Sequence, residues 1–226
     1  MMNIIEIKNL YKIYNENKPN EFLALNNINL EIQNGEIVII KGVSGSGKST
    51  LLCLIAALSK PTKGEILVNG ANISKLPDIM SSSYRHKDIG FIFQSFNLLD
   101  SLSVYQNVLA PLALTSLKKD ELNSKILNAM QIANIAHKRD QIVSSLSGGE
   151  KQRLAIARSL VMEPSIILAD EPTANLDKEN SLIFIEMLKK FKDLKKTVLV
   201  ATHDILFDEL DFVDRYIHIK NGEMIS

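Results

Sequence analysis

The fold is decided by the stretch Gly42-Val43-Ser44-Gly45-Ser46-Gly47-Lys48-Ser49. It matches the pattern G-x-x-x-x-G-K-[ST], with the apolar run Ile37–Ile40 before it and an apolar helix expected from Thr50. In this setting the glycines let backbone N–H groups turn toward a phosphate, and the helix N-terminus adds positive potential. We expect Lys48 to reach the β- and γ-phosphates of a nucleotide, and the Ser49 hydroxyl to ligate Mg²⁺. The sequence therefore predicts nucleotide binding.

Length and composition limit the domain organisation and the classes of function that the chain can have. The chain has 226 residues, which suits one large α/β domain, or one domain carrying a subdomain. The chain has 26 Lys and Arg residues and 26 Asp and Glu residues, so we do not expect it to bind nucleic acid through a broad basic surface. The single cysteine, Cys53, lies among apolar residues and is predicted to be a buried structural thiol in a reducing compartment. The N-terminal residues Met1–Ile4 show no signal pattern, and no run of about 18 apolar residues occurs, so we expect the chain not to cross a membrane by itself.

The order of the expected elements indicates one mostly parallel sheet. Alternating residues predict half-buried strands near the N-terminus, and fully apolar runs predict buried strands that alternate with helices. The expected strands are Ile5–Lys8, Ile28–Ile32, Ile37–Ile40, Glu65–Val68, Ile89–Phe93, Ile166–Ala169, Thr197–Ala201 and Tyr216–Ile219, with a short final strand after Asn221-Gly222. Helical spacing dominates from Ser95 to about Met162 and returns at Lys178–Lys192. We therefore expect residues 1–94 and 163–226 to form a nucleotide-binding core with an antiparallel β subdomain, and residues 95–162 to form a helical subdomain inserted in it.

Two carboxylates follow a buried strand in Ile166-Ile167-Leu168-Ala169-Asp170-Glu171. Because the ligands of a parallel sheet bind at the carboxyl ends of its strands, we expect these acids to lie beside the phosphate loop. One carboxylate can hold Mg²⁺ through water, and the other can orient and polarise an attacking water molecule.

A second glycine motif, Leu146-Ser147-Gly148-Gly149-Glu150, opens another expected helix. Ser147 is a good N-cap residue, and the helix N-terminus behind it can bind an anion. A chain with one phosphate loop does not obviously need a second site for a γ-phosphate. The need arises if two copies pair head to tail, so that this loop closes over the nucleotide held by the partner.

Together these motifs resemble the ATP-binding-cassette ATPase family, and the resemblance covers essentially the whole chain. It rests on Gly42–Ser49, Gln94, Leu146–Glu150, Ile166–Glu171, Ala174-Asn175-Leu176-Asp177 and His203, in that order. The resemblance implies a P-loop NTPase fold, with a RecA-like core whose sheet is mostly parallel, an antiparallel β subdomain and an inserted helical subdomain. Within the family the chain is most similar to the lipoprotein-release and macrolide-export group, through Leu25–Ile28, Lys60–Gly64, Ile89–Gln94, Phe96–Leu99 and Asp170–Asp177.

The resemblance also assigns chemical roles. Glu171 would be the catalytic carboxylate, His203 would hydrogen-bond the γ-phosphate, and Gln94 would sense both the metal and the attacking water. The Mg²⁺ ligands would be Ser49, Gln94 and Asp170.

ATP would be held by residues from both glycine motifs and from two other segments. Tyr14 would stack on the adenine, and Asp177 would lie at the interface between two copies. The expected contacts are Tyr14, Gly42, Ser44, Gly45, Ser46, Gly47, Lys48, Ser49, Thr50, Ser147, Gly148, Gly149, Glu150 and Asp177. Glu150 stands where many family members have Gln, Val43 where Pro is frequent, and Asn175 where a smaller residue is usual.

The function implied is an ATPase subunit that works as an ATP-dependent homodimer and drives integral membrane permease subunits on separate chains. Such a chain would be cytoplasmic and peripheral on the inner face of the cell membrane. Its partners would dock near Gln94, where Phe96, Leu98 and Leu99 could supply an apolar groove. One alternative is a cell-division-type cassette ATPase that signals to wall hydrolases without transporting a substrate. A phosphotransferase would leave Leu146–Glu150 without a purpose, and a DNA-associated cassette is disfavoured by the neutral charge and the absence of a long coiled-coil insertion.

Overall fold

The computed structural model describes residues 3–225, so Met1 and Met2, which belong to the stretch predicted to lack a signal, lie outside the described residues. The N-terminal part forms an antiparallel sheet with the strand order β2-β1-β4-β5. Its strands are β1 (Asn3–Tyr14), β2 (Phe22–Gln33), β4 (Lys63–Val68) and β5 (Ala71–Asn72). Strand β1 is longer than the predicted Ile5–Lys8, because a register shift between Ile7 and Leu10 interrupts the alternation on which the prediction depended.

The second sheet has the order β10-β9-β3-β8-β7-β6, and every pairing except that of β10 with β9 is parallel. Its strands are β3 (Ile37–Lys41), β6 (Ile89–Ile92), β7 (Ile166–Asp170), β8 (Thr197–Thr202), β9 (Arg215–Lys220) and β10 (Glu223–Ile225). The apolar runs form the central strands because both faces of this sheet are covered, as is usual for parallel sheets. The predicted α/β class with a mostly parallel sheet is confirmed.

Six α-helices connect the strands among the described residues. They are α1 (Lys48–Ile55), α2 (Asp78–Asp88), α3 (Val104–Leu109), α4 (Lys119–Ile132), α5 (Gly148–Leu160) and α6 (Lys178–Asp193). Helices α3, α4 and α5 lie between β6 and β7 in the chain. Helix α2 was not predicted, because Ser81 is its one buried residue and it therefore has no apolar stripe to detect.

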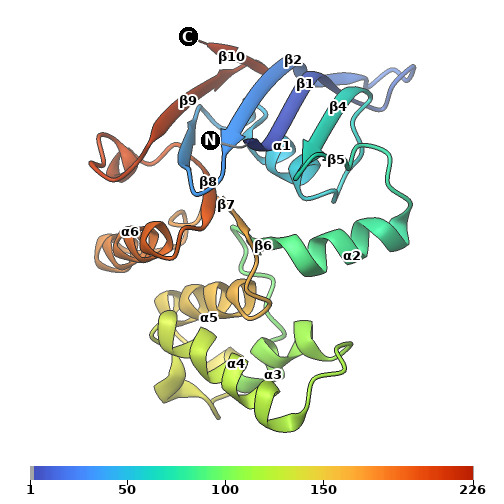
Figure 1. Cartoon of the computed structure of the whole chain (residues 1–226). Helices are drawn as coiled ribbons and strands as arrows, with labels where there is room; N and C mark the ends of the chain where they lie inside the picture. The colour runs from blue at the N-terminus through green and yellow to red at the C-terminus, as the bar shows by residue number, and fades with distance from the viewer. Residues whose placement is uncertain (1–2, 226) are drawn as a thin grey trace.

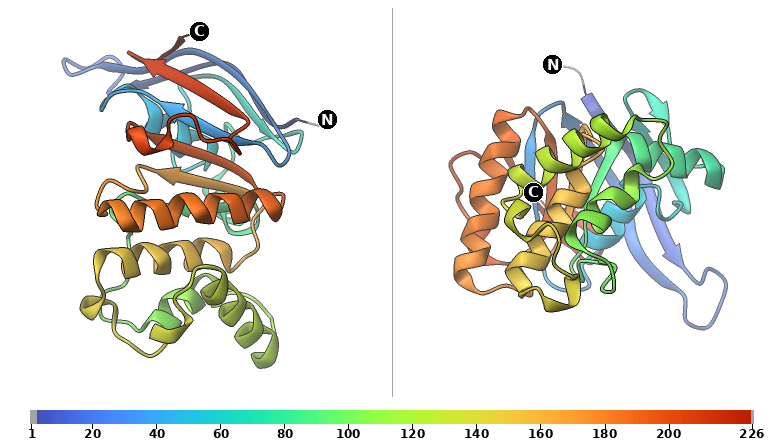
Figure 2. Two further views of the ribbon diagram at one scale, coloured as in Figure 1. Left: turned by 90° about the vertical axis from the view of Figure 1, so that its left-hand side faces the viewer. Right: turned by 90° about the horizontal axis from the view of Figure 1, so that it is seen from below.

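The two faces of the main sheet carry different layers. Val38 and Ile40 of β3 pack in a cluster with α1 and the antiparallel sheet, whereas Ile37 and Ile39 pack in a cluster with α3 to α6. The phosphate loop with α1 and the second glycine motif with α5 thus lie on opposite faces of the main sheet (Figure 1). Figure 2 shows the sheets at one end of the molecule and α3 and α4 at the other, with α5 and α6 between them.

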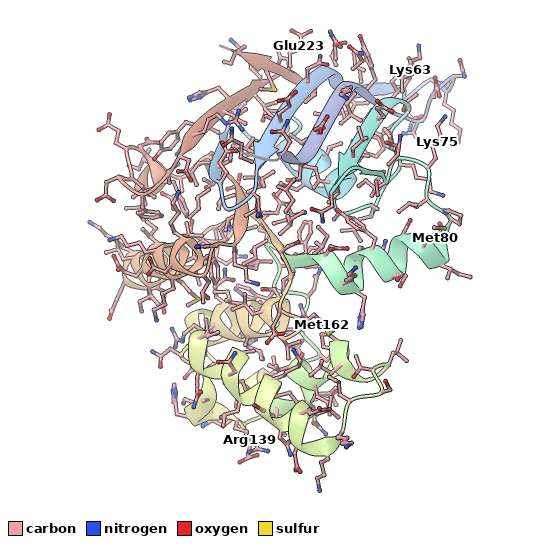
Figure 3. The ribbon with its side chains drawn as sticks, viewed as in Figure 1. Lys63, Lys75, Met80, Arg139, Met162 and Glu223 are labelled. Atoms are coloured by element: carbon pink, nitrogen blue, oxygen red, sulfur yellow. The ribbon has the colours of Figure 1, made fainter. Side chains whose placement is uncertain are left out.

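The long axis of the molecule runs from the sheets to the helices. Figure 3 shows Glu223 at the outer edge of the sheets and Arg139 at the opposite, helical end. In residues 3–225 no helix combines the length and the apolar character that crossing a membrane requires.

The thiol of Cys53 on α1 is partly exposed, whereas the sequence predicted a buried one. Burial and the negative charge of Asp170 nevertheless raise the pKa of its thiol, which favours the unreactive protonated form.

Candidate active site

Two glycines of the phosphate loop between β3 and α1 are required because other backbone segments lie very close to them. A Cβ on Gly42 would lie 2.3 Å from the Ile219 carbonyl oxygen, and one on Gly47 would lie 2.7 Å from that of Ala24. Gly47 also has a φ of 109°, in the left-handed region, and immediately precedes α1. A side chain at either position would displace the loop from the strands that support it.

Lys48 is buried at the first turn of α1 and points back into the loop. Its Nζ donates to the carbonyl oxygens of Gly42 at 2.7 Å and Val43 at 3.1 Å, and it lies 3.3 Å from Oε1 of Glu171. The ammonium therefore joins the phosphate loop to the end of β7, where the two predicted acids lie.

Ser49 and Asp170 form the part of the site suited to a cation. The Ser49 hydroxyl donates to Oδ1 of Asp170 at 2.7 Å. Burial raises the pKa of Asp170, the hydrogen bond from Ser49 opposes this shift, and the nearby Glu171 charge adds to it. A hydroxyl and a carboxylate oxygen side by side are the hard oxygen donors that Mg²⁺ prefers, so these two residues fit the predicted metal. The carbonyl oxygen of Gln94, the third predicted metal ligand, accepts a hydrogen bond from Asn175 Nδ2 at 2.9 Å, which connects the end of β6 to the loop after β7.

Glu171 and His203 meet at the ends of β7 and β8. His203 Nδ1 lies 3.0 Å from Oε1 of Glu171. Glu171 has a φ of 44°, an uncommon conformation for a residue other than glycine, and its N–H donates to the Ala201 carbonyl oxygen at 2.8 Å. Strained backbone of this kind persists only where the surrounding structure holds it. In this conformation the Glu171 carboxylate lies against both Lys48 and His203.

The second glycine motif forms the N-terminus of α5. The Ser147 hydroxyl accepts from the Glu150 N–H at 3.4 Å, and the Glu150 carboxylate accepts from the Ser147 N–H at 2.8 Å. This capping box confirms the predicted N-cap at Ser147. The Ser147 backbone hydrogen bond and Lys138, whose Nζ lies 3.0 Å from Glu150, lower the pKa of Glu150 to about 2.

Asp177 caps the neighbouring helix α6. Its Oδ1 accepts from the backbone N–H of Asn180 at 2.8 Å and from the Asn180 side-chain amide at 2.9 Å. These hydrogen bonds lower the pKa of Asp177, which keeps the carboxylate charged. Arg153 Nη1 donates to Asn180 Oδ1 at 3.1 Å, so α5 is linked to the first turn of α6.

Comparison with known proteins identifies the family to which the chain belongs. A family profile described as ABC transporter matches residues 25–174. The chain belongs to the ABC transporter family. This ABC ATPase is 41% identical over 224 residues to the lipoprotein-releasing system ATP-binding protein LolD of Wigglesworthia glossinidia brevipalpis, covering 99% of the chain and 96% of that relative. It is 39% identical over 227 residues to the uncharacterized ABC transporter ATP-binding protein YvcR of Bacillus subtilis (strain 168), covering 100% and 87%.

A solved structure supports the same assignment. The dimeric post-hydrolysis state of the ATP-binding cassette MJ0796, bound to ADP and Pi, matches with a TM-score of 0.89 and 38% identity, covering 98% of this chain and 97% of that one. The predicted family, its P-loop NTPase fold and its ATPase activity are therefore confirmed.

The predicted site residues of this ABC ATPase fall into separate groups. Direct contacts join Gly42, Lys48, Ser49, Asp170, Glu171 and His203 into one cluster. Tyr14 lies outside this cluster at the end of β1, where the Lys12 ammonium sits 4.9 Å from its ring centroid. The residues Ser147–Glu150 lie on α5, and Asp177 lies at the start of α6.

Three polar residues of this ABC ATPase near the cluster were not predicted from the sequence. Lys41 and Thr173 each donate a hydrogen bond to Asp204, the residue that follows His203. The available signals were a charged residue ending the apolar strand β3 and polar residues following β7 and β8, but such residues are common at strand ends.

Proposed function

We propose that this ABC ATPase works as a head-to-tail homodimer that hydrolyses ATP at two shared sites. In each site the loop Gly42–Ser49 of one copy holds the triphosphate, and Ser147–Glu150 of the other copy closes over it. One observation carries the proposal: α1 and α5 lie on opposite faces of the main sheet. The two anion-binding helix N-termini of one chain therefore lie apart, on either side of the main sheet, and a second copy can supply the missing half of each site.

Within each site the chain's own groups have separate tasks. Lys48 neutralises charge on the β- and γ-phosphates, and Ser49 and Asp170 hold Mg²⁺, which would add further positive charge there. Glu171 orients and polarises the attacking water, while His203 hydrogen-bonds the γ-phosphate. The contacts Lys48–Glu171 and Glu171–His203 support these roles, because they gather the three groups at one point.

The remaining predicted residues recognise the base and connect the two copies. Tyr14 is 38% exposed, which leaves ring surface for stacking on adenine. Asp177 would lie at the dimer interface. Within its own chain, Asp177 is hydrogen-bonded to Asn180, and Asn180 to Arg153, which would connect the interface to α5. Gln94 would report the state of the metal and the attacking water to the helices that follow it.

The membrane partner would be a permease subunit on a separate chain, holding this ATPase to the inner face of the cell membrane. A cavity of about 290 Å³ beside Gln94 would receive a cytoplasmic segment of that partner. Its apolar lining includes Phe91 and Phe93, whose rings stack with centroids 4.2 Å apart. The rest of the lining comes largely from the C-terminal ends of α2 and α5 and from nearby loops, and it includes Arg85, Arg158 and Met162. Phe96 and Leu98, expected from the sequence, are half-buried, and Leu98 packs against the helical core.

The finer function that we propose is lipoprotein release or macrolide-type export. The 41% identity to LolD over nearly the whole of both chains supports the first of these. Co-purification of the tagged chain from membranes, followed by identification of the bound subunit, tests it. A wall-hydrolase-linked partner would instead indicate the cell-division alternative. Phe93→Glu should abolish this co-purification, whereas Ile79→Glu, on the highly exposed Ile79 of α2, should leave it intact.

The dimer is tested with Glu171→Gln, which removes the carboxylate that polarises water but keeps the size of the side chain. We expect ATP turnover to fall by about 100-fold or more, and MgATP to convert the variant from monomer to dimer in size-exclusion chromatography with light scattering. Glu179→Gln, on an exposed acid in the first turn of α6, should behave as wild type. Normal turnover in Glu171→Gln, or a variant that stays monomeric with MgATP, would contradict the proposal.

A further inference from the structure

Lys41 is a buried lysine at the root of the phosphate loop. It is the last residue of β3, it directly precedes Gly42, and it is 8% exposed. Its Nζ donates to the backbone carbonyl oxygen of Asp204 at 2.6 Å and lies 2.5 Å from Oδ1 of Asp208. Since burying an ammonium costs free energy unless it is paired, this charge is held by a specific set of partners.

Asp204 is held from two further sides. The Thr173 hydroxyl donates to Oδ2 of Asp204 at 2.8 Å, and the Asp204 N–H donates to the Thr202 hydroxyl at 3.0 Å. Thr173 is 4% exposed and Thr202 is fully buried. Asp204 is therefore fixed by contacts from β3, from the loop after β7 and from β8.

His203 lies between the two fixed residues Thr202 and Asp204. Its side chain is 62% exposed, so packing does not hold the imidazole in place. Two parallel contacts instead join the loops after β7 and β8, one from Glu171 to His203 and one from Thr173 to Asp204. The position of the imidazole thus depends on the backbone that Asp204 anchors.

We propose that Lys41 is a positioning residue for ATP hydrolysis, which holds Asp204 so that the adjacent His203 meets Glu171 and the γ-phosphate. This inference rests on the roles of His203 and Glu171 given under the proposed function. Lys41 acts through Asp204 and does not itself touch the nucleotide. It connects β3 to the segment 204–208 through its contacts with Asp204 and Asp208.

The surroundings of Lys41 argue against a role confined to stability. Strand β3 is paired on both sides, with β8 and β9, and its four apolar residues are fully buried. The Asp208 side chain is 54% exposed, so water can solvate its carboxylate when the ammonium is removed. Loss of the ammonium therefore mainly releases the segment that carries Asp204.

Lys41→Met tests the inference, because methionine fills much of the same space without charge. Steady-state kinetics should show kcat lowered by about tenfold, with KM and the Kd for MgATP within about twofold of wild type, since a small misplacement of a reacting group lowers the rate without weakening binding. The matched control is Lys192→Met, which removes an ammonium paired with Asp214 away from the site and should keep wild-type kcat. A Lys41→Met protein that folds and keeps wild-type kcat would overturn the inference.

Thr173→Val approaches the same anchor from the other side and keeps the test decisive if Lys41→Met does not fold. It should also lower kcat by about tenfold at nearly constant KM. The two changes combined should lower kcat by clearly less than the product of the single effects, because both release Asp204. Fully multiplicative effects, or an unchanged kcat in Thr173→Val, would contradict a shared anchor. Failure of Glu171→Gln to slow turnover would instead contradict the proposed function, so the two failures are distinguishable.

Discussion

Gly149 and Asn180 lie in direct contact across the seam between α5 and α6: a Cβ added to Gly149 would come 2.0 Å from Oδ1 of Asn180. That amide cannot move freely, because Arg153 donates to its oxygen and its NH₂ group donates to Asp177. The second glycine of the motif is thus required by packing within one chain, in addition to any contact with a nucleotide.

Gly149→Ala should therefore destabilise the protein. The added methyl group must displace Asn180 and break its hydrogen bonds, which we expect to lower the free energy of unfolding by about 1–3 kcal/mol. Urea unfolding measures the change. Gly148→Ala is the matched control, because a Cβ there would meet only the Asn175 carbonyl oxygen at an ordinary 3.5 Å. Equal stability of the two variants would show that Asn180 yields without cost.

Glu150 should make stability depend on pH in the acidic range. Its folded-state pKa of about 2 lies below the ordinary value of 4.5, so its stabilisation is complete above pH 4.5 and is lost as pH falls toward 2. Glu150→Gln keeps a side chain that can complete the capping box but does not titrate. Between pH 6 and pH 3 the stability of wild type should fall by about 1 kcal/mol more than that of the variant, a value reduced by solvent screening. Parallel urea curves at both pH values test this, and identical pH dependence would contradict it.

Arg158 fixes the loop that follows Gln94. Its guanidinium donates to the carbonyl oxygens of Phe96 at 2.7 Å and Asn97 at 2.5 Å, two residues with positive φ. Burial lowers the pKa of this guanidinium, but the group stays charged at neutral pH because arginine is a very strong base. Arg158→Met should speed amide hydrogen exchange in residues 95–99 by about tenfold or more, since hydrogen bonds from a charged donor contribute about 1.5–3 kcal/mol.

Arg158→Lys should restore only part of this protection, because a single ammonium cannot reproduce the planar pair of donors. Lys87→Met, on the exposed surface of α2, serves as the control and should leave exchange in the loop unchanged. Wild-type exchange rates in Arg158→Met would show that the loop keeps its shape without this anchor.

Removal of Mg²⁺ by EDTA should stop ATP turnover, and added Mg²⁺ should restore it. Ser49→Ala deletes the hydroxyl that meets Asp170 and should raise the Mg²⁺ concentration for half-maximal activity by about tenfold or more. Ser49→Thr keeps the hydroxyl and should stay near wild type. If Ser49→Ala showed a wild-type Mg²⁺ requirement, the metal would have to bind through other residues.

The sequence allowed prediction of those features that depend on neighbouring residues. The phosphate loop, the strand before it and the two acids after Ala169 each lie within one short segment, and the capping box at Ser147 spans four residues. The anchor around Asp204 could not be predicted, because its partners Lys41, on β3, and Thr173, in the loop after β7, are far apart in the chain and meet Asp204 only in the folded protein.

The groove expected for the membrane partner shows a second limit of prediction from the sequence. The sequence analysis placed this groove near Gln94 with Phe96, Leu98 and Leu99 as its apolar residues, whereas the apolar lining of the cavity found there includes Phe91 and Phe93. Phe96 takes a φ of 61° in a turn, and Leu98 packs against the helical core. The direction of a side chain after a strand ends depends on turn conformation, which hydrophobic periodicity does not specify.

The half-buried thiol of Cys53 offers a practical route to watching two copies meet. Because its raised pKa leaves little thiolate at neutral pH, alkylating reagents should modify it slowly, and it is the only cysteine in the chain. A reporter cysteine introduced at Asp140, whose side chain is 96% exposed and lies outside both glycine motifs, should therefore accept a fluorophore or spin label selectively, even before Cys53 is replaced by alanine. Distances between labels on paired copies would then follow the closing and opening of the assembly through each round of turnover.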